Sequence, residues 1–331
     1  MTLILAFVPV VLFLGSLLYI DSYKLVGPAR IVTVILSGAL AAMASFLLNQ
    51  AVMDAALVDG RTLRRFVAPA LEEALKLIVI AVLIRTRRIG FVIDAAICGF
   101  AAGAGFALVE NLYYISALSR PELGFWVVRG FGTAVMHGGT TAIAAMITKA
   151  LCQRRESEPL ALVLPGFVVA FAIHSLFNQF ILPPLASALA VTAVLPPLLV
   201  LIFAQSERYL QRWLGSGFDL DAQLLAAIRS GDFASSRPGR YLQSLRDHFE
   251  GPVVADMLCY LRLHTELSLR AKGILMLREN GLPVSRDAHT AAKLTEMQYL
   301  RTTIGRTGQL ALAPILPSTS RDEWQMQLLE E

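Results

Sequence analysis

The feature that most constrains the fold of this chain is a series of long apolar runs in its first 204 residues. A helix needs about 20 predominantly apolar residues to cross the hydrocarbon core of a bilayer, which is about 30 Å thick. By that measure the sequence predicts seven transmembrane helices, near 2–20, 31–57, 66–84, 91–116, 124–149, 160–181 and 185–204. Pro196 and Pro197 predict a kink or a later start in the last of them. We therefore expect an all-α polytopic membrane helix bundle.

Charged residues divide the chain near residue 205. Residues 1–204 hold 14 of the 29 Lys and Arg and 10 of the 25 Asp and Glu, whereas residues 205–331 hold 15 of each. The whole chain is only 16% charged, against roughly a quarter in an ordinary soluble domain. We therefore predict a membrane-embedded domain over 1–204 and a soluble helical domain over 205–331, where apolar residues recur at helical spacing.

Lys and Arg in the short loops predict the orientation in the membrane. With the N-terminus outside, ten of these residues lie on the inner side and four on the outer side. We therefore expect the N-terminus outside and the C-terminal domain in the cytoplasm, although Arg61, Arg64 and Arg65 oppose this orientation. No basic run with interleaved aromatic residues is present, so we expect the lipid bilayer and membrane proteins, not nucleic acid, as partners. The three cysteines form no CxxC pair and imply no disulfide framework.

Ionisable side chains inside the predicted spans carry functional information, because each costs roughly 2.5–3.5 kcal/mol at mid-bilayer on insertion scales. In the third span, Glu72 and Glu73 point about 100° apart, and Lys76 lies one turn from both. One interpretation is a buried Glu–Lys pair that holds helices together. A single Glu would suffice for that pair, so the second carboxylate favours a general base.

The fourth span combines glycines with a second polar group. Its glycines between 99 and 105 predict a close approach to a neighbouring helix. Glu110 and Asn111 follow inside an apolar run, with Tyr114 one turn after the Glu. Asp94, near the start of the span, is either a helix-entry residue or part of a site.

The fifth and sixth spans supply two histidines. The fifth span has one polar stripe at steps of four residues, formed by Arg129, Thr133, His137 and Thr141. We expect Arg129 to extend toward the outer membrane surface and to have no part in catalysis. In the sixth span, His174 and Asn178 are four residues apart and therefore share one helix face.

Two carboxylates, two imidazoles and a carboxamide from three helices are suited to hydrolysis. A carboxylate can take a proton from water, while imidazole and amide donors stabilise an oxyanion. Alternatively, His137, His174 and either Glu72 or Glu73 could hold a divalent metal such as zinc, with water in the open position. The sequence therefore leaves the cofactor undecided. A glutamate-type enzyme would need none, whereas a metallo-type enzyme would need a divalent metal such as zinc. The chain has no HExxH and no GxGD motif, which excludes zincin-like and aspartyl intramembrane proteases.

Four motifs within 66–180 resemble, in their order and rough spacing, the PrsW family of intramembrane proteases: Glu72-Glu73-x-x-Lys76, the Gly-rich helix ending in Glu110-Asn111-x-x-Tyr114, His137, and His174-x-x-x-Asn178. That family is similar to the CAAX-protease and bacteriocin-processing group. The resemblance implies endoproteolysis of a membrane-associated protein, often an anti-sigma factor, in the inner membrane of a bacterium. It also implies that Glu72 and Glu73 supply the base and that His137, His174 and Asn178 complete the catalytic site, with Lys76, Glu110, Asn111 and Tyr114 in support.

Two alternatives from other functional classes also follow from charged residues in membrane spans. An ion- or proton-coupled transporter would contain related halves with a broken helix in each, and the sequence has no such symmetry. A non-catalytic membrane scaffold is disfavoured because every main motif position is filled. The sequence makes no prediction of the oligomeric state.

Overall fold

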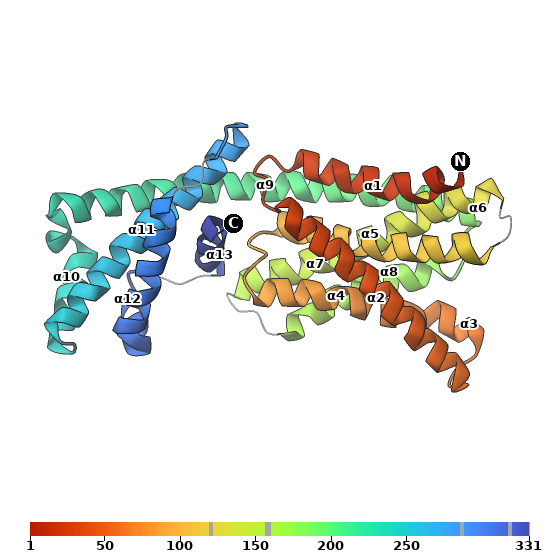
Figure 1. Cartoon of the computed structure of the whole chain (residues 1–331), viewed down its shortest axis with the longest axis horizontal. Coiled ribbons are helices and arrows are strands. Elements are labelled where there is room, and N and C mark those ends of the chain that lie inside the picture. The colour runs from red at the N-terminus through yellow and green to blue at the C-terminus, as the bar shows by residue number, and fades with distance from the viewer. Residues whose placement is uncertain (119–121, 156–159, 285–287, 317–319, 331) are drawn as a thin grey trace. The chain divides into compact units, whose positions relative to one another are not determined.

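The computed structural model describes residues 1–118, 122–155, 160–284, 288–316 and 320–330 (Figure 1). Every regular element in these residues is a helix, as the sequence predicts, and no strand occurs among them. The chain divides into two compact units, Met1–Glu207 and Arg208–Glu331. The boundary lies inside one long helix.

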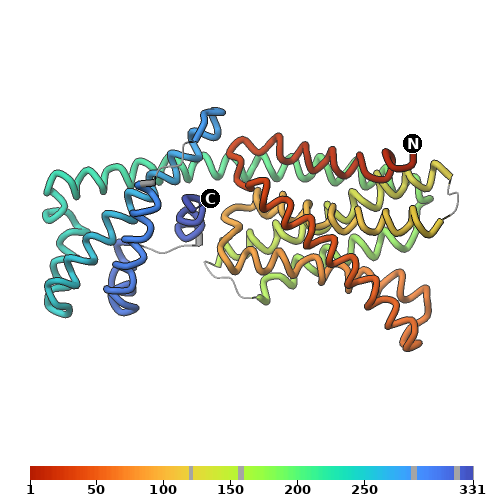
Figure 2. The backbone as a smooth tube through the Cα atoms, in the orientation of Figure 1, coloured from red at the N-terminus to blue at the C-terminus, as the bar shows by residue number. Residues whose placement is uncertain are grey.

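The first unit is built from α-helices with two π-helical segments, η1 and η2, and one 3-10 segment, η3. Its elements are α1 (Thr2–Ile20), α2 (Pro28–Asp54), α3 (Gly60–Thr62), η1 (Leu63–Val67), α4 (Ala68–Arg85), α5 (Val92–Ala117), α6 (Leu123–Val127), η2 (Val128–Ala134), α7 (Val135–Arg155), η3 (Leu160–Leu162), α8 (Val163–Phe177) and the start of α9 (Pro184–Ser230). The described connections between α1 and α2, α4 and α5, and α8 and α9 are short, as the backbone trace shows (Figure 2).

Five helical segments among the described residues are long and apolar enough to cross a membrane: α1, α2, α5, Leu160–Phe177 and α9. The other two predicted spans, 66–84 and 124–149, are helical as well and are formed mainly by α4 and α7. Their charged and polar residues lower their hydropathy, so the count of seven stays a prediction. Helix α9 begins at Pro184 and continues through Pro196 and Pro197, so a later start is excluded and the kink at these prolines stays a prediction.

Helix α5 forms the core of the first unit and is buried along most of its length, packed between α2 and α7. A Cβ atom added at Gly105 would lie 2.0 Å from the carbonyl oxygen of Ile35 in α2. One added at Gly103 would lie 2.1 Å from the carbonyl oxygen of His137 in α7. Only glycine permits these approaches, and the predicted close contact of this helix is confirmed. The contact with α7 occurs at the level of His137, so α5 also positions the candidate site.

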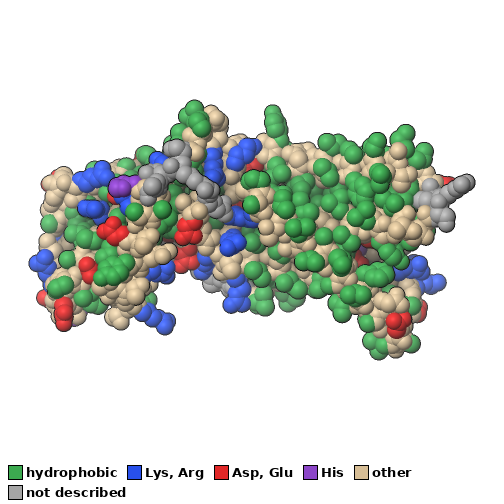
Figure 3. Space-filling model, viewed as in Figure 1, with side chains coloured by type: hydrophobic (Ala, Val, Ile, Leu, Met, Phe, Trp, Pro, Cys, Tyr) green, Lys and Arg blue, Asp and Glu red, His purple; other side chains and the backbone are tan. Residues whose placement is uncertain are grey.

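The outer surface of the first unit is largely apolar. Large side chains such as Leu40, Leu47 and Ile181 are 66%, 69% and 72% exposed. On the face drawn in Figure 3, hydrophobic side chains cover most of these helices, whereas charged side chains are frequent over the second unit. Contiguous exposed apolar surface of this extent suits a lipid environment.

The second unit is helical and has its own apolar core. It contains the end of α9, η4 (Asp232–Ser235), α10 (Arg237–Ser244), η5 (Leu245–Asp247), α11 (Gly251–Glu279), α12 (Ala288–Leu312) and α13 (Ser320–Glu330). Helix α11 supplies Met257 and Leu261, both fully buried, to this core. An ion pair of 2.6 Å joins the Nζ atom of buried Lys272 to the Oδ2 atom of Asp221.

Candidate active site

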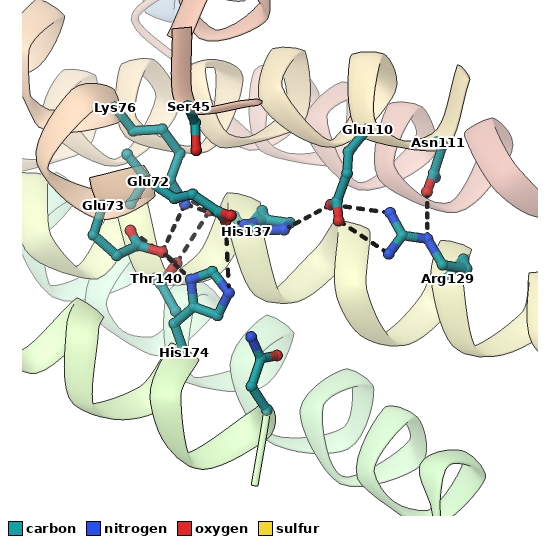
Figure 4. A network of polar contacts seen from close by, with 12 residues as sticks. Ser45, Glu72, Glu73, Lys76, Glu110, Asn111, Arg129, His137, Thr140 and His174 are labelled. Carbon is teal, nitrogen blue, oxygen red and sulfur yellow. Dashed lines mark hydrogen bonds and ion pairs between the residues drawn. The ribbon is translucent and has the colours of Figure 1, made fainter. Parts of the chain in front are cut away.

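Side chains from α4, α5, α7 and α8 converge on one polar network inside the first unit (Figure 4). The imidazole rings of His137 on α7 and His174 on α8 lie edge to face, with their centroids 4.8 Å apart. Both carboxylates from α4 point toward these rings. The structure therefore brings together the acidic helix and the two histidine helices that the sequence selected.

Glu73 is fully buried and closely bonded. Its Oε1 atom lies 2.7 Å from the Nζ atom of Lys76 and 2.8 Å from the Nδ1 atom of His174. The hydroxyl of Thr140 on α7 donates to the same oxygen at 3.3 Å. A carboxylate that accepts from Nδ1 fixes the tautomer and orientation of the ring and leaves Nε2 free for other partners. Glu73 therefore orients His174, and the predicted Glu–Lys pair is present at this carboxylate.

Glu72 differs from its neighbour in exposure and in partners. Its side chain is 16% exposed, and its Oε2 atom lies 3.8 Å from the Nε2 atom of His174. No hydrogen bond to the carboxylate of Glu72 occurs among the described residues, and the side chain lines a large cavity that Glu73 does not reach. Of the two candidate bases, Glu72 is thus the one that water and substrate can contact.

His137 is held at both ring nitrogens. Its Nδ1 atom lies 3.2 Å from the Nζ atom of Lys76, and its Nε2 atom lies 3.0 Å from the Oε2 atom of Glu110 on α5. Because an ammonium group only donates, Nδ1 accepts from Lys76 and Nε2 donates to Glu110. The ring of Phe106 packs against the imidazole with a centroid distance of 4.9 Å. The orientation of His137 is therefore fixed from α4 and α5 together.

Arg129 corrects an expectation from the sequence. Its side chain was expected to extend to the membrane surface, but it is 8% exposed and its guanidinium contacts both carboxylate oxygens of Glu110, at 2.9 and 3.2 Å. Its Nε atom donates to the Oδ1 atom of Asn111 at 2.9 Å, and the group lies over the ring of Tyr114. Arg129 thus contacts Glu110, Asn111 and Tyr114, three of the residues predicted to support the site, although Arg129 itself was not among them.

Asn178 and Asp94 lie outside the network of imidazoles and carboxylates. The amide of Asn178 donates to the carbonyl oxygen of Arg64 at 3.0 Å, which ties the end of α8 to η1 just before α4. Asn178 and His174 nevertheless line the same cavity, so their predicted action on one object stays a prediction. Asp94 caps α5, since its oxygens accept from the backbone N–H groups of Gly90 and Phe91. Its helix-entry interpretation is confirmed.

The cavity beside the network has a volume of about 1330 Å³. Its polar lining includes Glu72, Glu110, His137, His174 and Asn178, and its apolar lining includes Phe46, Tyr113, Tyr114, Phe125 and Phe177. Typical small-molecule pockets occupy roughly 300–1,000 Å³, so this space is large enough for a segment of a polypeptide.

Glu72, His137 and His174 also form a possible metal site, because one ligand atom from each lies within 4.8 Å of the others. Two imidazoles and a carboxylate are the donor set of several zinc hydrolases. A histidine that binds a metal through one ring nitrogen usually donates from the other, often to a carboxylate, and the Nδ1 atom of His174 donates to Glu73 in this way. A histidine ligand is a neutral imidazole that binds through its unprotonated nitrogen, so His137 would have to give up its contact with Lys76 at Nδ1, or change tautomer and give up its contact with Glu110 at Nε2. The chemistry of the residues present therefore fits a divalent metal.

Sequence reasoning overlooked Thr140 and the role of Arg129. Thr140 follows His137 by three residues, which places both on one helix face. Its neighbour Thr141, which belonged to the predicted polar stripe, instead donates to the carbonyl oxygen of His137 within α7. For Arg129 the available signal was an acidic residue, Glu110, inside the preceding span.

Comparison with protein families finds that the model described as PrsW family intramembrane metalloprotease matches residues 27–204, more than half of the chain. The matched segment contains every side chain of the network described above. It does not include α1 or the second unit. No significant match is found among curated proteins or among solved structures.

Proposed function

Because the chain belongs to the PrsW family of intramembrane metalloproteases, we propose that it hydrolyses a peptide bond of a membrane-associated protein in the cavity beside Glu72. The observation that carries this proposal is the difference between two adjacent carboxylates in burial and bonding. Glu73 is buried and bonded to Lys76 and His174, whereas Glu72 is partly exposed in the cavity.

Glu72 is the proposed general base. Its carboxylate faces the cavity without a hydrogen bond from a described residue, so it can accept a proton from a water molecule. The Nε2 atom of His174, which Glu73 leaves free, lies next to this carboxylate and can take part in proton transfer at the scissile bond, whereas both ring nitrogens of His137 are already bonded. Lys76 and Glu110 hold His137, and Glu73 holds His174, which limits the motion of both rings.

Glu72, His137 and His174 are also the residues that would hold a divalent metal. A bound metal of this kind polarises a carbonyl and lowers the pKa of a bound water. Dialysis of the purified protein against a chelator distinguishes the two forms of the proposal. Loss of cleavage with recovery on addition of zinc supports the metallo-type, and unchanged cleavage in metal-free protein supports the glutamate-type.

The test of the proposed function compares the N-termini of membrane proteins in cells that express the native chain, Glu72→Gln or Glu122→Gln. Glu122 is an exposed carboxylate outside the network and serves as the matched control. We expect N-termini within or beside apolar segments that depend on Glu72, with a decrease of roughly 10²–10⁴-fold in their rate of formation in Glu72→Gln. Equal sets of N-termini in all three strains would show that the proposal is wrong.

We further propose an anti-sigma factor as the type of substrate, the inner membrane of a bacterium as the location, and the orientation with the second unit in the cytoplasm. Cys259 provides a test of orientation, since it is exposed in the second unit, whereas Cys98 and Cys152 are buried. An impermeant maleimide should label it only after the membrane is permeabilised. Labelling in intact cells would reverse the proposed orientation.

A further inference from the structure

Arg129 is placed to control the position of His137. Both side chains contact the same carboxylate, because the Oε2 atom of Glu110 lies 2.9 Å from the Nη2 atom of Arg129 and 3.0 Å from the Nε2 atom of His137. The guanidinium also contacts the second oxygen of Glu110, at 3.2 Å. A planar cation that engages both oxygens fixes the plane of the carboxylate. The carboxylate in turn fixes the imidazole ring.

The same guanidinium is tied to α1 through Asn111. The Oδ1 atom of Asn111 accepts from Arg129 Nε at 2.9 Å, and its Nδ2 atom donates to the carbonyl oxygen of Ala6 at 2.7 Å. Asn111 is fully buried, so no water competes for these two bonds. A continuous chain of polar contacts therefore leads from the backbone of α1 to the imidazole of His137.

A second contact between α1 and this region is steric. A Cβ atom added at Gly130, the residue after Arg129, would lie 1.8 Å from the carbonyl oxygen of Leu5. Helix α1 therefore packs directly on the π-helical segment η2 that carries Arg129. The segment that matches the family begins at residue 27, so α1 lies outside it.

We propose that α1 is a positioning element of the active site, which acts on His137 through Asn111, Arg129 and Glu110. Arg129 is then a positioning residue, and Gly130 permits the helix contact that keeps it in place. The part of this proposal that concerns catalysis rests on the proposed function. The part that concerns the orientation of His137 is independent of it.

The first experiment measures kcat and KM of purified variants in liposomes on a membrane protein whose cleavage depends on Glu72. Loss of a residue that orients a catalytic ligand typically lowers activity 10–100-fold. We expect Arg129→Gln to lower kcat by about that factor with little change in KM, and Arg129→Lys to restore part of it. The double variant Glu110→Gln/Arg129→Gln should be no worse than Glu110→Gln alone. Multiplied losses in the double variant, or no loss in Arg129→Gln, would overturn the proposal.

The second experiment needs no proteolysis. Diethyl pyrocarbonate modifies unbonded imidazole nitrogens, and mass spectrometry measures the modification of His137 relative to exposed His248. We expect greater modification of His137 in Gly130→Ala and Asn111→Ala than in the native chain. The control is Gly15→Ala, since a Cβ at Gly15 in α1 meets no atom within 4 Å.

The two readouts separate the possible failures. Increased modification of His137 in Gly130→Ala, together with cleavage that does not depend on Glu72, would retain the role of α1 and reject the proposed function. Native modification and native kcat in Arg129→Gln, Asn111→Ala and Gly130→Ala would reject the role of α1 and leave the proposed function intact. If Gly130→Ala fails to fold, the other two variants decide.

Discussion

Replacement of Glu73 by glutamine removes one charge from a fully buried ion pair. Both side chains of the pair are 0% exposed, and the Nζ atom of Lys76 lies 2.7 Å from the carboxylate. Removal of one partner of a buried pair typically costs about 3–5 kcal/mol, because the other charge stays without compensation. Glutamine keeps one carbonyl oxygen as an acceptor, so we expect a loss of stability near the lower end, about 3 kcal/mol.

The same substitution one residue earlier should behave differently. The carboxylate of Glu72 makes no hydrogen bond to a described residue, and the Nε2 atom of His174 lies 3.8 Å from it. We expect the free energy of unfolding of Glu72→Gln to remain within about 0.5 kcal/mol of the native value, as for substitutions that break no buried contact. Cleavage should nevertheless be lost, because the proposed base is absent. We thus expect Glu73→Gln to lower the free energy of unfolding, and Glu72→Gln to abolish cleavage while the free energy of unfolding stays near the native value.

The assay combines unfolding in detergent micelles with cleavage of one substrate by each variant. The variant Glu73→Gln/Lys76→Met provides the internal control, since removal of both charges should restore most of the stability. It should not restore cleavage, because His174 has lost the carboxylate at its Nδ1 atom. Equal stability of Glu73→Gln and Glu72→Gln, or full cleavage by Glu72→Gln, would refute the assignment of these two roles.

Three further predictions follow from the packing of the first unit. Gly103→Ala would place a Cβ atom 2.1 Å from the carbonyl oxygen of His137, so we expect overpacking to lower stability by about 1–3 kcal/mol or more, and Gly15→Ala to show no such loss by thermal unfolding. Burial raises the pKa of Asp21, directly after α1, to about 6 from 3.8, so ionisation costs stability as the pH rises from about 4 to 6. Asp21→Asn should therefore raise the melting temperature at pH ~7, with little effect below pH ~4, and equal shifts at both pH values would contradict this cause. Asn178→Ala removes a hydrogen bond to a backbone carbonyl in η1, so cleavage should fall several-fold with the metal content of the purified protein unchanged; loss of metal would instead make Asn178 part of the metal site.

The sequence was sufficient to predict an all-helical chain and the helices whose polar side chains come together in the candidate site. Charged residues are costly in lipid, so Glu72, Glu73, His137 and His174 stood out from their apolar surroundings. Glycine spacing also predicted correctly that α5 makes close contacts, and its packing against α7 defines where His137 lies. These inferences succeed because each depends on a local pattern along one helix.

The different environments of Glu72 and Glu73 could not be derived in the same way. Adjacent residues on a helix point about 100° apart, so both can face a bundle interior. The distinction depends on partners from other helices, since His174 on α8 and Thr140 on α7 surround Glu73 and leave Glu72 toward the cavity. Such contacts depend on helix rotation, which the pattern of a single span does not define.

Arg129 shows a further reason why a regular helical pattern was insufficient. In an ideal α-helix, eight residues separate Arg129 from His137 by about 80° around the axis. Residues Val128–Ala134 instead form a π-helix, whose i→i+5 hydrogen bonds place about one more residue in each turn and so reduce that offset. Both side chains consequently reach the same carboxylate of Glu110. The expectation that Arg129 extends to the membrane surface assumed water as its only partner, whereas the π-helical turn brings it to the partly buried carboxylate of Glu110 and the buried amide of Asn111.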